Sequence, residues 1–144
     1  MASDQLTKWL ALENLSDGPI NILGDSVRFE LTRNSGAAFG TLRGAGSWLA
    51  LLAAVVVVIV FVSMRHGIDR LTLTALGLVL GGAVGNLTDR LFRGDGIADG
   101  LVVDFIDFGP WPNFNVADSA IVVGIMLILW ESLRTPSKPS SPSA

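Results

Sequence analysis

The sequence predicts a mainly α-helical membrane protein, and its composition and apolar segments lead to this expectation. Half of its 144 residues are apolar, only 16% are charged, and the mean hydropathy is +0.55. A soluble domain of this size rarely has such a composition. We expect a single membrane-embedded domain over residues 1–134, followed by a disordered Ser/Pro-rich tail over residues 135–144.

The N-terminal part of the chain, residues 1–46, has a different pattern from the rest. A short helix is expected from Asp4 to Leu15. Residues Ile20–Leu23 and Val27–Thr32 have strand-like content, and Gly-Pro and Gly-Asp turn signals interrupt the segment. These signals predict a small sheet at the membrane surface.

The first spanning helix is expected at about residues 47–64. Every residue from Leu49 to Val62 is apolar, and the flanking residues extend the segment to a length that crosses roughly 30 Å of hydrocarbon. The β-branched run Val55–Val60 would suit a buried strand in a soluble protein, but the length of the segment favours a helix. Trp48 near its start is typical of the membrane interface.

A second spanning helix is expected at residues 71–87. It carries Gly77, Gly81 and Gly85 at four-residue spacing, which puts all three on one face and lets another helix pack closely. Because the loop before it is short, at residues 65–70, the first two spanning helices should be antiparallel neighbours.

The third spanning helix is expected at residues 116–130, with Asn115 as its N-cap and Trp130 at the opposite membrane interface. Residues 90–115 form a polar connection that contains glycine and proline. Val102 and Val103 are its only β-branched pair before Asp104.

The sequence also excludes several kinds of site. It has no cysteine, so disulfides, thiolate metal sites and a cysteine nucleophile are ruled out. Its one histidine, His66, lies between arginines and is interpreted as a solvated loop residue. The net charge of −3 provides no basic patch for nucleic acid. Residues 1–4 lack the basic and apolar regions of a cleavable signal peptide.

Polar residues at the ends of membrane helices require an explanation, because burial in the membrane is costly for them. Asn86, Asp89 and Arg90 lie three and four residues apart, which places them on one helical face. We interpret this group as mainly structural, with Asp89 paired to Arg90 or to another cation.

Asp104 and Asp118 are candidates for acid–base chemistry. Asp118 follows the N-cap Asn115, where an acid also stabilises a helix start. Two adjacent carboxylates share one proton, so one can act as general base and the other as general acid. Spacing alone does not choose between Asp104 and the other acids of the connection, which are Asp95, Asp99 and Asp107.

Five stretches of the chain resemble, in order, the signature blocks of lipoprotein signal peptidase, also called signal peptidase II. They are DQLTK at 4–8, NSGAAFG at 34–40, GNLTDR at 85–90, VVDFID at 102–107 and FNVADSA at 114–120. Together the blocks span nearly the whole chain up to the tail. Each block alone is modest evidence, but five in the right order are highly specific.

The resemblance implies an intramembrane aspartic endopeptidase of the bacterial inner membrane. Members of this family are multi-pass proteins with four transmembrane helices and a small extracytoplasmic β-cradle. They remove the signal peptide from prolipoproteins that carry diacylglycerol, with the active site toward the extracytoplasmic face. The implied partners are these prolipoproteins and membrane lipid, with no nucleic acid and with neither a metal nor an organic cofactor.

The family resemblance also assigns residues. The two catalytic aspartates of the family fall on Asp104 and Asp118, which resolves the choice that spacing left open. The family's positions for shaping the site and holding substrate match Asp4, Lys8, Asn34, Gly36, Ala38, Asn86, Asp89, Arg90 and Asn115. The order in which the two aspartates act as base and acid is left open.

One departure from the family pattern lies at the N-terminus. Family members place the DQLTK block at the outer end of a first transmembrane helix, whereas only three residues precede it here. We therefore expect that helix to be missing and three helices to span the membrane. Two alternatives are a small transporter or proton relay through Asp89, Asp104 and Asp118, and an inactive lipoprotein-binding homologue. The lack of an internal repeat is evidence against a transporter.

Overall fold

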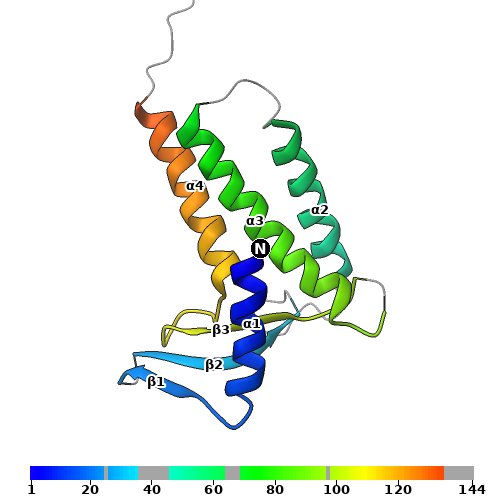
Figure 1. The fold of residues 1–144 in the computed structure, drawn as a ribbon, viewed down its shortest axis with the longest axis vertical. Helices are drawn as coiled ribbons and strands as arrows, with labels where there is room; N and C mark the ends of the chain where they lie inside the picture. The colour runs from blue at the N-terminus through cyan, green and yellow to red at the C-terminus, as the bar shows by residue number, and fades with distance from the viewer. Residues whose placement is uncertain (25, 36–45, 64–68, 97, 135–144) are drawn as a thin grey trace, which may run out of the picture.

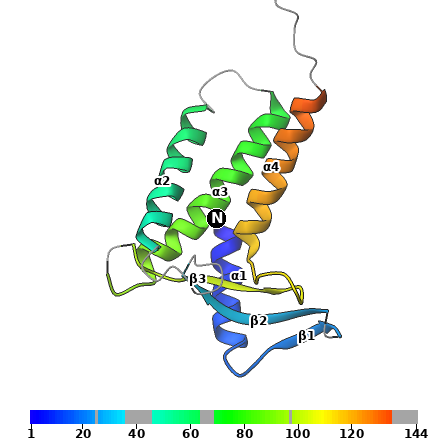
Figure 2. The same cartoon turned by 180° about the vertical axis from the view of Figure 1, so that it is seen from behind.

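The computed structural model describes residues 1–24, 26–35, 46–63, 69–96 and 98–134. The elements follow in the order α1 (Ala2–Asn14), β1 (Ile20–Leu23), β2 (Val27–Asn34), α2 (Gly46–Ser63), α3 (Arg70–Phe92), β3 (Val102–Asp107) and α4 (Val116–Arg134). Figure 1 shows α2, α3 and α4 side by side, with the sheet and α1 at one end of them. Seen from behind in Figure 2, α3 lies between α2 and α4.

The helices α3 and α4 are long and apolar enough to cross a membrane, and α2 adds the apolar stretch Ala53–Val62 among the described residues. Large apolar side chains also face outward on α2 and α4. Those with exposed fractions of 55% or more are Leu51, Val58, Ile59, Val122, Met126, Trp130 and Leu133. A soluble monomer does not expose so much apolar surface, whereas lipid covers it at no cost.

Both ends of α3 are set by polar groups. Its N-cap is Asp69, whose carboxylate accepts the backbone N–H groups of Leu71 at 2.8 Å and Thr72 at 3.0 Å. The sequence pattern predicts an end near residue 87, but the helix continues to Phe92. It does so because the buried residue Asp89 contacts side chains of α1. The sequence of α3 alone does not show these partners.

Glycines bring α3 and α4 together, but not all of those expected. A Cβ atom at Gly82 would lie 2.4 Å from the carbonyl oxygen of Ala117, and one at Gly124 would lie 2.6 Å from that of Ala75. A Cβ at Gly77 would meet no described atom within 4 Å. The predicted stripe is therefore wrong for Gly77, because the face in contact with α4 is rotated toward Gly82.

The sheet has three antiparallel strands in the order β1-β2-β3. The first strand has the predicted bounds, and the second is two residues longer than predicted. The third, β3, lies inside the segment expected to be a connection. It forms because β2 supplies its hydrogen-bonding partner from about seventy positions earlier in the chain, and the pair Val102-Val103 was its only local signal.

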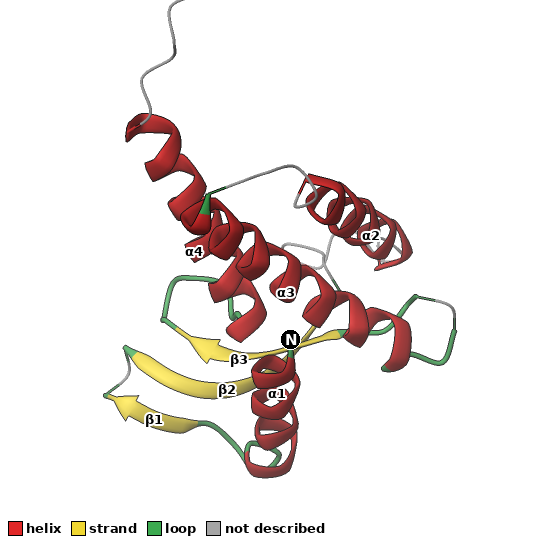
Figure 3. Ribbon diagram, turned by 45° about the horizontal axis from the view of Figure 1, so that its top comes forward, coloured by secondary structure: helices red, strands yellow, loops and turns green. Residues whose placement is uncertain are grey.

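The helix α1 packs across the sheet, as Figure 3 shows. Ala11 and Leu15 contact Phe105 of β3 in a small apolar core. Phe29 of β2 meets the Phe105 ring edge-on, with 6.1 Å between ring centroids. This packing fixes α1 in the corner between the sheet and the helical bundle.

Candidate active site

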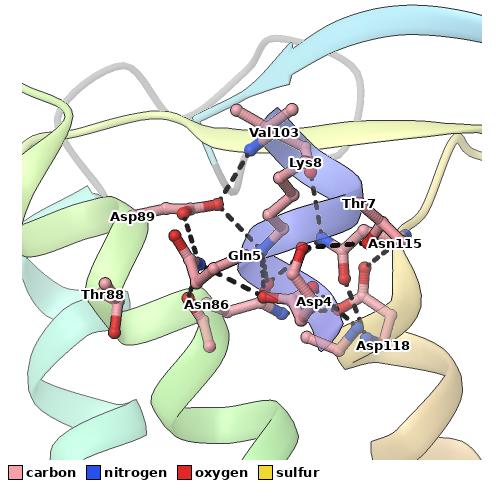
Figure 4. A network of polar contacts seen from close by, with 12 residues as sticks. Asp4, Gln5, Thr7, Lys8, Asn86, Thr88, Asp89, Val103, Asn115 and Asp118 are labelled. Atoms are coloured by element: carbon pink, nitrogen blue, oxygen red, sulfur yellow. Dashed lines mark hydrogen bonds and ion pairs between the residues drawn. The ribbon is translucent and has the colours of Figure 1, made fainter. Parts of the chain in front are cut away.

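A cluster of buried polar side chains lies where α1, α3, β3 and α4 meet (Figure 4). Asp4, Lys8, Asp89, Asp104 and Asn115 are each no more than 1% exposed. A charge withdrawn from water in this way is strongly destabilising unless it is paired and hydrogen-bonded. Each of these side chains has such partners, so hydrogen bonds and ion pairs offset the cost of burying the cluster.

The helix α1 contributes Asp4 and Lys8 because its polar face is turned inward. The Lys8 Nζ atom lies 3.0 Å from Asp4 and 2.8 Å from Asp89, and it donates to Asn86 Oδ1 at 2.9 Å. The second oxygen of Asp4 accepts the N–H of Ala117 at 3.0 Å, in the first turn of α4. Lys8 and Asp4 therefore connect α1 to both α3 and α4.

Asp89 on α3 pairs with two cations, and Arg90 is not one of them. Its carboxylate is 2.8 Å from Lys8 Nζ and 2.9 Å from Arg93 Nε, one helical turn further on. It also accepts the N–H of Val103 at 3.1 Å, which anchors β3. The guanidinium group of Arg90 instead donates to the carbonyl of Asn86 at 3.3 Å. Asp89 was expected to pair with Arg90 or with another cation, and the structure shows the second of these alternatives.

Asp104 is held from two sides. Asn34 on β2 donates to its Oδ2 atom at 2.9 Å, and Asn115 donates to its Oδ1 atom at 2.7 Å. Burial raises the pKa of Asp104 to about 6, against the opposing hydrogen bond from Asn34. The negative charge of Asp118 adds to the increase, as expected for two neighbouring carboxylates.

Asp118 lies in the first turn of α4 and is half-buried. Asn86 donates to its Oδ1 atom at 2.7 Å, and the backbone N–H of Asn115 donates to its Oδ2 atom at 3.2 Å. The Asn115 side-chain oxygen in turn accepts the N–H of Asp118 at 3.0 Å. Asp118 is therefore both part of the helix cap and a neighbour of the buried cluster.

Asn115 joins the two aspartates. Its Oδ1 atom is occupied by the N–H of Asp118, so its Nδ2 group faces the opposite way, toward Asp104. The same Nδ2 group also donates to Asn86 Oδ1 at 3.1 Å and to the carbonyl of Val103 at 3.2 Å. One amide side chain thus holds β3, α3 and the start of α4 in fixed relation.

The other acids of the connection lie apart from this cluster. Asp107 pairs with Arg28 of β2, which holds the pKa of its carboxyl below the ordinary value. Asp99 accepts the N–H of Gly96 at 3.0 Å in its own exposed loop, and Asp95 is exposed. Of the described aspartates between residues 90 and 115, Asp104 is therefore the one that contacts Asn115.

Two of the predicted site residues, Gly36 and Ala38, lie outside the described residues, as do His66 and the tail at 135–144. Two residues of the cluster were missed. Gln5 donates to Asp89 at 2.9 Å, and Arg93 donates to Gln5 at 3.3 Å as well as to Asp89. The spacing of Asp89 and Arg93, four residues apart on one helix, was a usable signal for this pair.

The fold and the cluster define a helical membrane protein with two aspartates from separate elements held on one asparagine, an arrangement suited to acid–base hydrolysis. The model of the family described as signal peptidase (SPase) II matches residues 1–134. The chain therefore belongs to the signal peptidase II family, which confirms the resemblance seen in its sequence.

Curated relatives agree with this placement. The lipoprotein signal peptidase of Rhodococcus jostii (strain RHA1) is 49% identical over 131 residues, which cover 90% of this chain and 66% of that protein. Those of Mycobacterium avium (strain 104) and Mycolicibacterium smegmatis are 46% and 44% identical and are covered over 71% and 65% of their lengths. The chain thus spans about two thirds of the length of these relatives.

Two solved structures share the fold. Both are of a bacterial membrane enzyme studied by the in meso method. One gives a TM-score of 0.83 at 25% identity and covers 99% of this chain and 88% of the other. The second gives a TM-score of 0.82 at 26% identity, with 94% and 88% covered. The expected fold class, a helical membrane bundle with a small sheet, is therefore confirmed.

Proposed function

We propose that the protein is an aspartic endopeptidase that removes the signal peptide from diacylglyceryl-modified prolipoproteins within the membrane. Membership of the signal peptidase II family and the names of the relatives support this activity. The observation that carries it is the sharing of Asn115 between Asp104 and Asp118. Asn115 donates to the carboxylate of Asp104 from its side chain and to the carboxylate of Asp118 from its backbone N–H, so one residue contacts both acids.

Asp104 and Asp118 are the proposed catalytic residues. Two neighbouring carboxylates do not both ionise readily, so the pair holds one proton over a range of pH. Burial favours the protonated form of Asp104, whose pKa is raised to about 6. Asp118 is half-buried and so less buried than Asp104. In the proposed reaction, Asp104 is the member of the pair that starts in the protonated form.

This distribution of charge assigns the first step. Asp118 removes a proton from water, and the water oxygen forms a bond to the scissile carbonyl carbon. Asp104 gives its proton to the carbonyl oxygen, which yields a neutral tetrahedral intermediate. The proton held by Asp118 then passes to the leaving nitrogen as the C–N bond breaks, and Asp104 recovers its proton from the hydroxyl group.

The surrounding residues shape the site in this proposal. Asn34, Asn86 and Asn115 orient the two carboxylates by donating to them. The ion pairs of Lys8 with Asp4 and Asp89 attach α1 to α3, and Asp89 also holds β3. Arg90 adds positive charge near the pair. Gly36 and Ala38 match small family residues that leave room for the peptide backbone.

The proposed location is the bacterial inner membrane, with several spanning helices and the active site on the extracytoplasmic side. The start of α3 and the end of α4 lie together at one end of the bundle, whereas the sheet lies at the other (Figure 1). Arg70 and Arg134 mark the first end, and positive residues favour the cytoplasm. The apolar outer faces of α2 and α4 suit a substrate that carries two acyl chains.

A reconstituted assay tests the activity. The full chain in lipid vesicles is given a prolipoprotein peptide that carries a diacylglyceryl cysteine, and the same peptide without the lipid is the control. We expect release of the signal peptide from the lipidated substrate alone. Equal cleavage of both peptides would contradict the substrate class. Proton flux across the vesicles without cleavage of either would support the proton relay instead.

A further inference from the structure

Strand β2 contains a register shift next to Asp104. Before the shift, Phe29 pairs with Ile106, and after it Thr32 pairs with Asp104. Three steps along β2 therefore correspond to two steps along β3. One extra residue of β2 is accommodated at residues 30–31, which is the arrangement of a β-bulge.

The bulge decides which side chains of β2 face Asp104. Residues directly opposite each other in antiparallel strands place their side chains on the same face, and faces alternate along a strand. The observed pairing puts Thr32 and Asn34 on the face of Asp104. An unbroken register from Phe29 would put Leu31 opposite Asp104 and turn Asn34 to the other face. The hydrogen bond from Asn34 to Asp104, at 2.9 Å, thus depends on the bulge.

Asn113 reaches this bulge from the far side of β3. Residue Phe114 forms a bridge with Ile106, so the chain before α4 runs along β3 on the side away from β2. The Asn113 side chain nevertheless donates from Nδ2 to Thr32 Oγ1 at 2.7 Å and, more weakly, to the carbonyl of Glu30 at 3.4 Å. Asn113 therefore contacts both the bulge and the residue that follows it.

We propose that Asn113 is a positioning residue for Asp104, which acts by holding the bulge of β2 through Thr32. With the bulge held, Asn34 stays on the face of Asp104 and donates to one carboxylate oxygen while Asn115 donates to the other. Asp104 is then oriented from both neighbouring segments at once. This assignment rests on the proposed function, because it gives Asn113 a role in that reaction.

The release of Asn34 would also change the charge state of Asp104. Burial raises the pKa of Asp104, and the hydrogen bond from Asn34 is the main opposing influence. The charged groups around Asp104 are Lys8 on α1, Arg90 on α3 and Asp118 on α4. None of them is altered by a substitution at Asn113. Loss of the hydrogen bond from Asn34 therefore moves the pKa of Asp104 upward.

The test compares Asn113→Ala and Thr32→Val with wild type in the vesicle assay with lipidated substrate. We expect each variant to lower kcat by roughly 10- to 100-fold with little change in KM, because a small displacement of a catalytic group has effects of this size. The double variant should be no worse than either single one, since both remove the same contact. The pH limb governed by Asp104 should move to higher pH.

Two control variants separate positioning from general destabilisation. Asn14→Ala removes a side-chain hydrogen bond of similar kind, from Asn14 Nδ2 to the carbonyl of Leu10 at 2.8 Å, on the exposed end of α1. It should behave as wild type. Thr32→Ser keeps the hydroxyl acceptor and should restore most of the activity lost in Thr32→Val. Hydrogen exchange over residues 102–107 should be faster in Asn113→Ala than in Asn14→Ala.

Wild-type kcat and an unmoved pH limb in Asn113→Ala would overturn the assignment, as would unchanged hydrogen exchange. If Asn113→Ala yields too little folded protein, Thr32→Val decides by the same measurements. Cleavage that persists in Asp104→Asn would refute the proposed function instead. In that case the exchange measurement still tests whether Asn113 holds the bulge.

Discussion

At the scale of single residues, Asn115 explains how a small membrane protein keeps two carboxylates in place. Its oxygen is committed to the N-terminus of α4, so its NH2 group is directed at Asp104. An amide is required here because the position needs an acceptor and a donor together. An acid at this position would place a third carboxylate beside Asp104, and an apolar residue would remove the donor to the Oδ1 atom of Asp104.

The first prediction concerns the catalytic pair. Asp104→Asn and Asp118→Asn should each abolish cleavage of the lipidated peptide, because a neutral amide is neither general base nor general acid. Asp107→Asn is the matched control, since this residue lies on the same strand but pairs with Arg28 outside the cluster. It should keep clear activity. Loss of cleavage in Asp107→Asn together with activity in Asp104→Asn would transfer the role.

The second prediction concerns stability and pH. The pKa of Asp104 in the folded protein, about 6, lies above the ordinary value of 3.8. The contribution of such a group to stability is complete below the ordinary pKa and is lost as the pH rises through the folded pKa. As the pH rises from about 4 to 7, the free energy of unfolding of Asp104→Asn should therefore increase relative to that of wild type by on the order of 3 kcal/mol. Denaturant unfolding in micelles measures this difference, and a flat difference would contradict it.

At the scale of the elements, contact between α3 and α4 depends on particular glycines. Gly124→Ala should lower the melting temperature and the folded yield, because its new Cβ would lie 2.6 Å from the carbonyl oxygen of Ala75. Overpacking of this kind typically costs about 1 to 3 kcal/mol. Gly77→Ala adds the same methyl group to α3 where no described atom lies within 4 Å, and it should be tolerated. Equal melting temperatures for the two variants would refute this account of the packing.

The attachment of α1 to the bundle depends on Asp89. Asp89→Ala removes one of the two carboxylates that pair with the fully buried Lys8 and also removes the acceptor of Val103, so both α1 and β3 lose a contact with α3. Breaking a buried pair costs roughly 3 to 5 kcal/mol, and we expect folded yield and activity to fall together. Arg93→Ala is the matched control, because Arg93 is 29% exposed and its loss leaves Lys8 paired. A normal folded yield of Asp89→Ala without cleavage would give Asp89 a role in the chemistry.

At the scale of the whole molecule, the sheet and α1 lie at one end of the bundle and the end of α4 lies at the other (Figure 1). Because the sequence has no cysteine, single cysteines report this orientation without background. Leu23→Cys, on an exposed position of β1, should react with a membrane-impermeant maleimide added to intact spheroplasts. Arg134→Cys should react only after permeabilisation. The reverse pattern would place the site on the cytoplasmic side.

The sequence by itself determined the features that depend on local pattern. Continuous apolar stretches identified the helical segments, because hydrocarbon requires a minimum length of apolar helix. The strand β1 followed from β-branched residues and turn signals, and Asn115 was identified as an N-cap from its position alone. The five motifs identified the family, and family membership pointed to Asp104 among several acids of similar spacing.

Only the tertiary structure decided which distant groups meet. One partner of Asp89 is Lys8, which lies near the start of the chain, and β3 exists because β2 lies beside it. Close packing involves Gly82 and Gly124 as well as the predicted Gly85, but not Gly77, since the angle at which two helices pack is not a property of either sequence segment. Hydrophobic periodicity indicates which face of a helix or strand is buried, but it does not indicate which residues meet there. The individual hydrogen bonds that hold Asp104 require three segments in fixed relation, and that relation arises only when the chain packs.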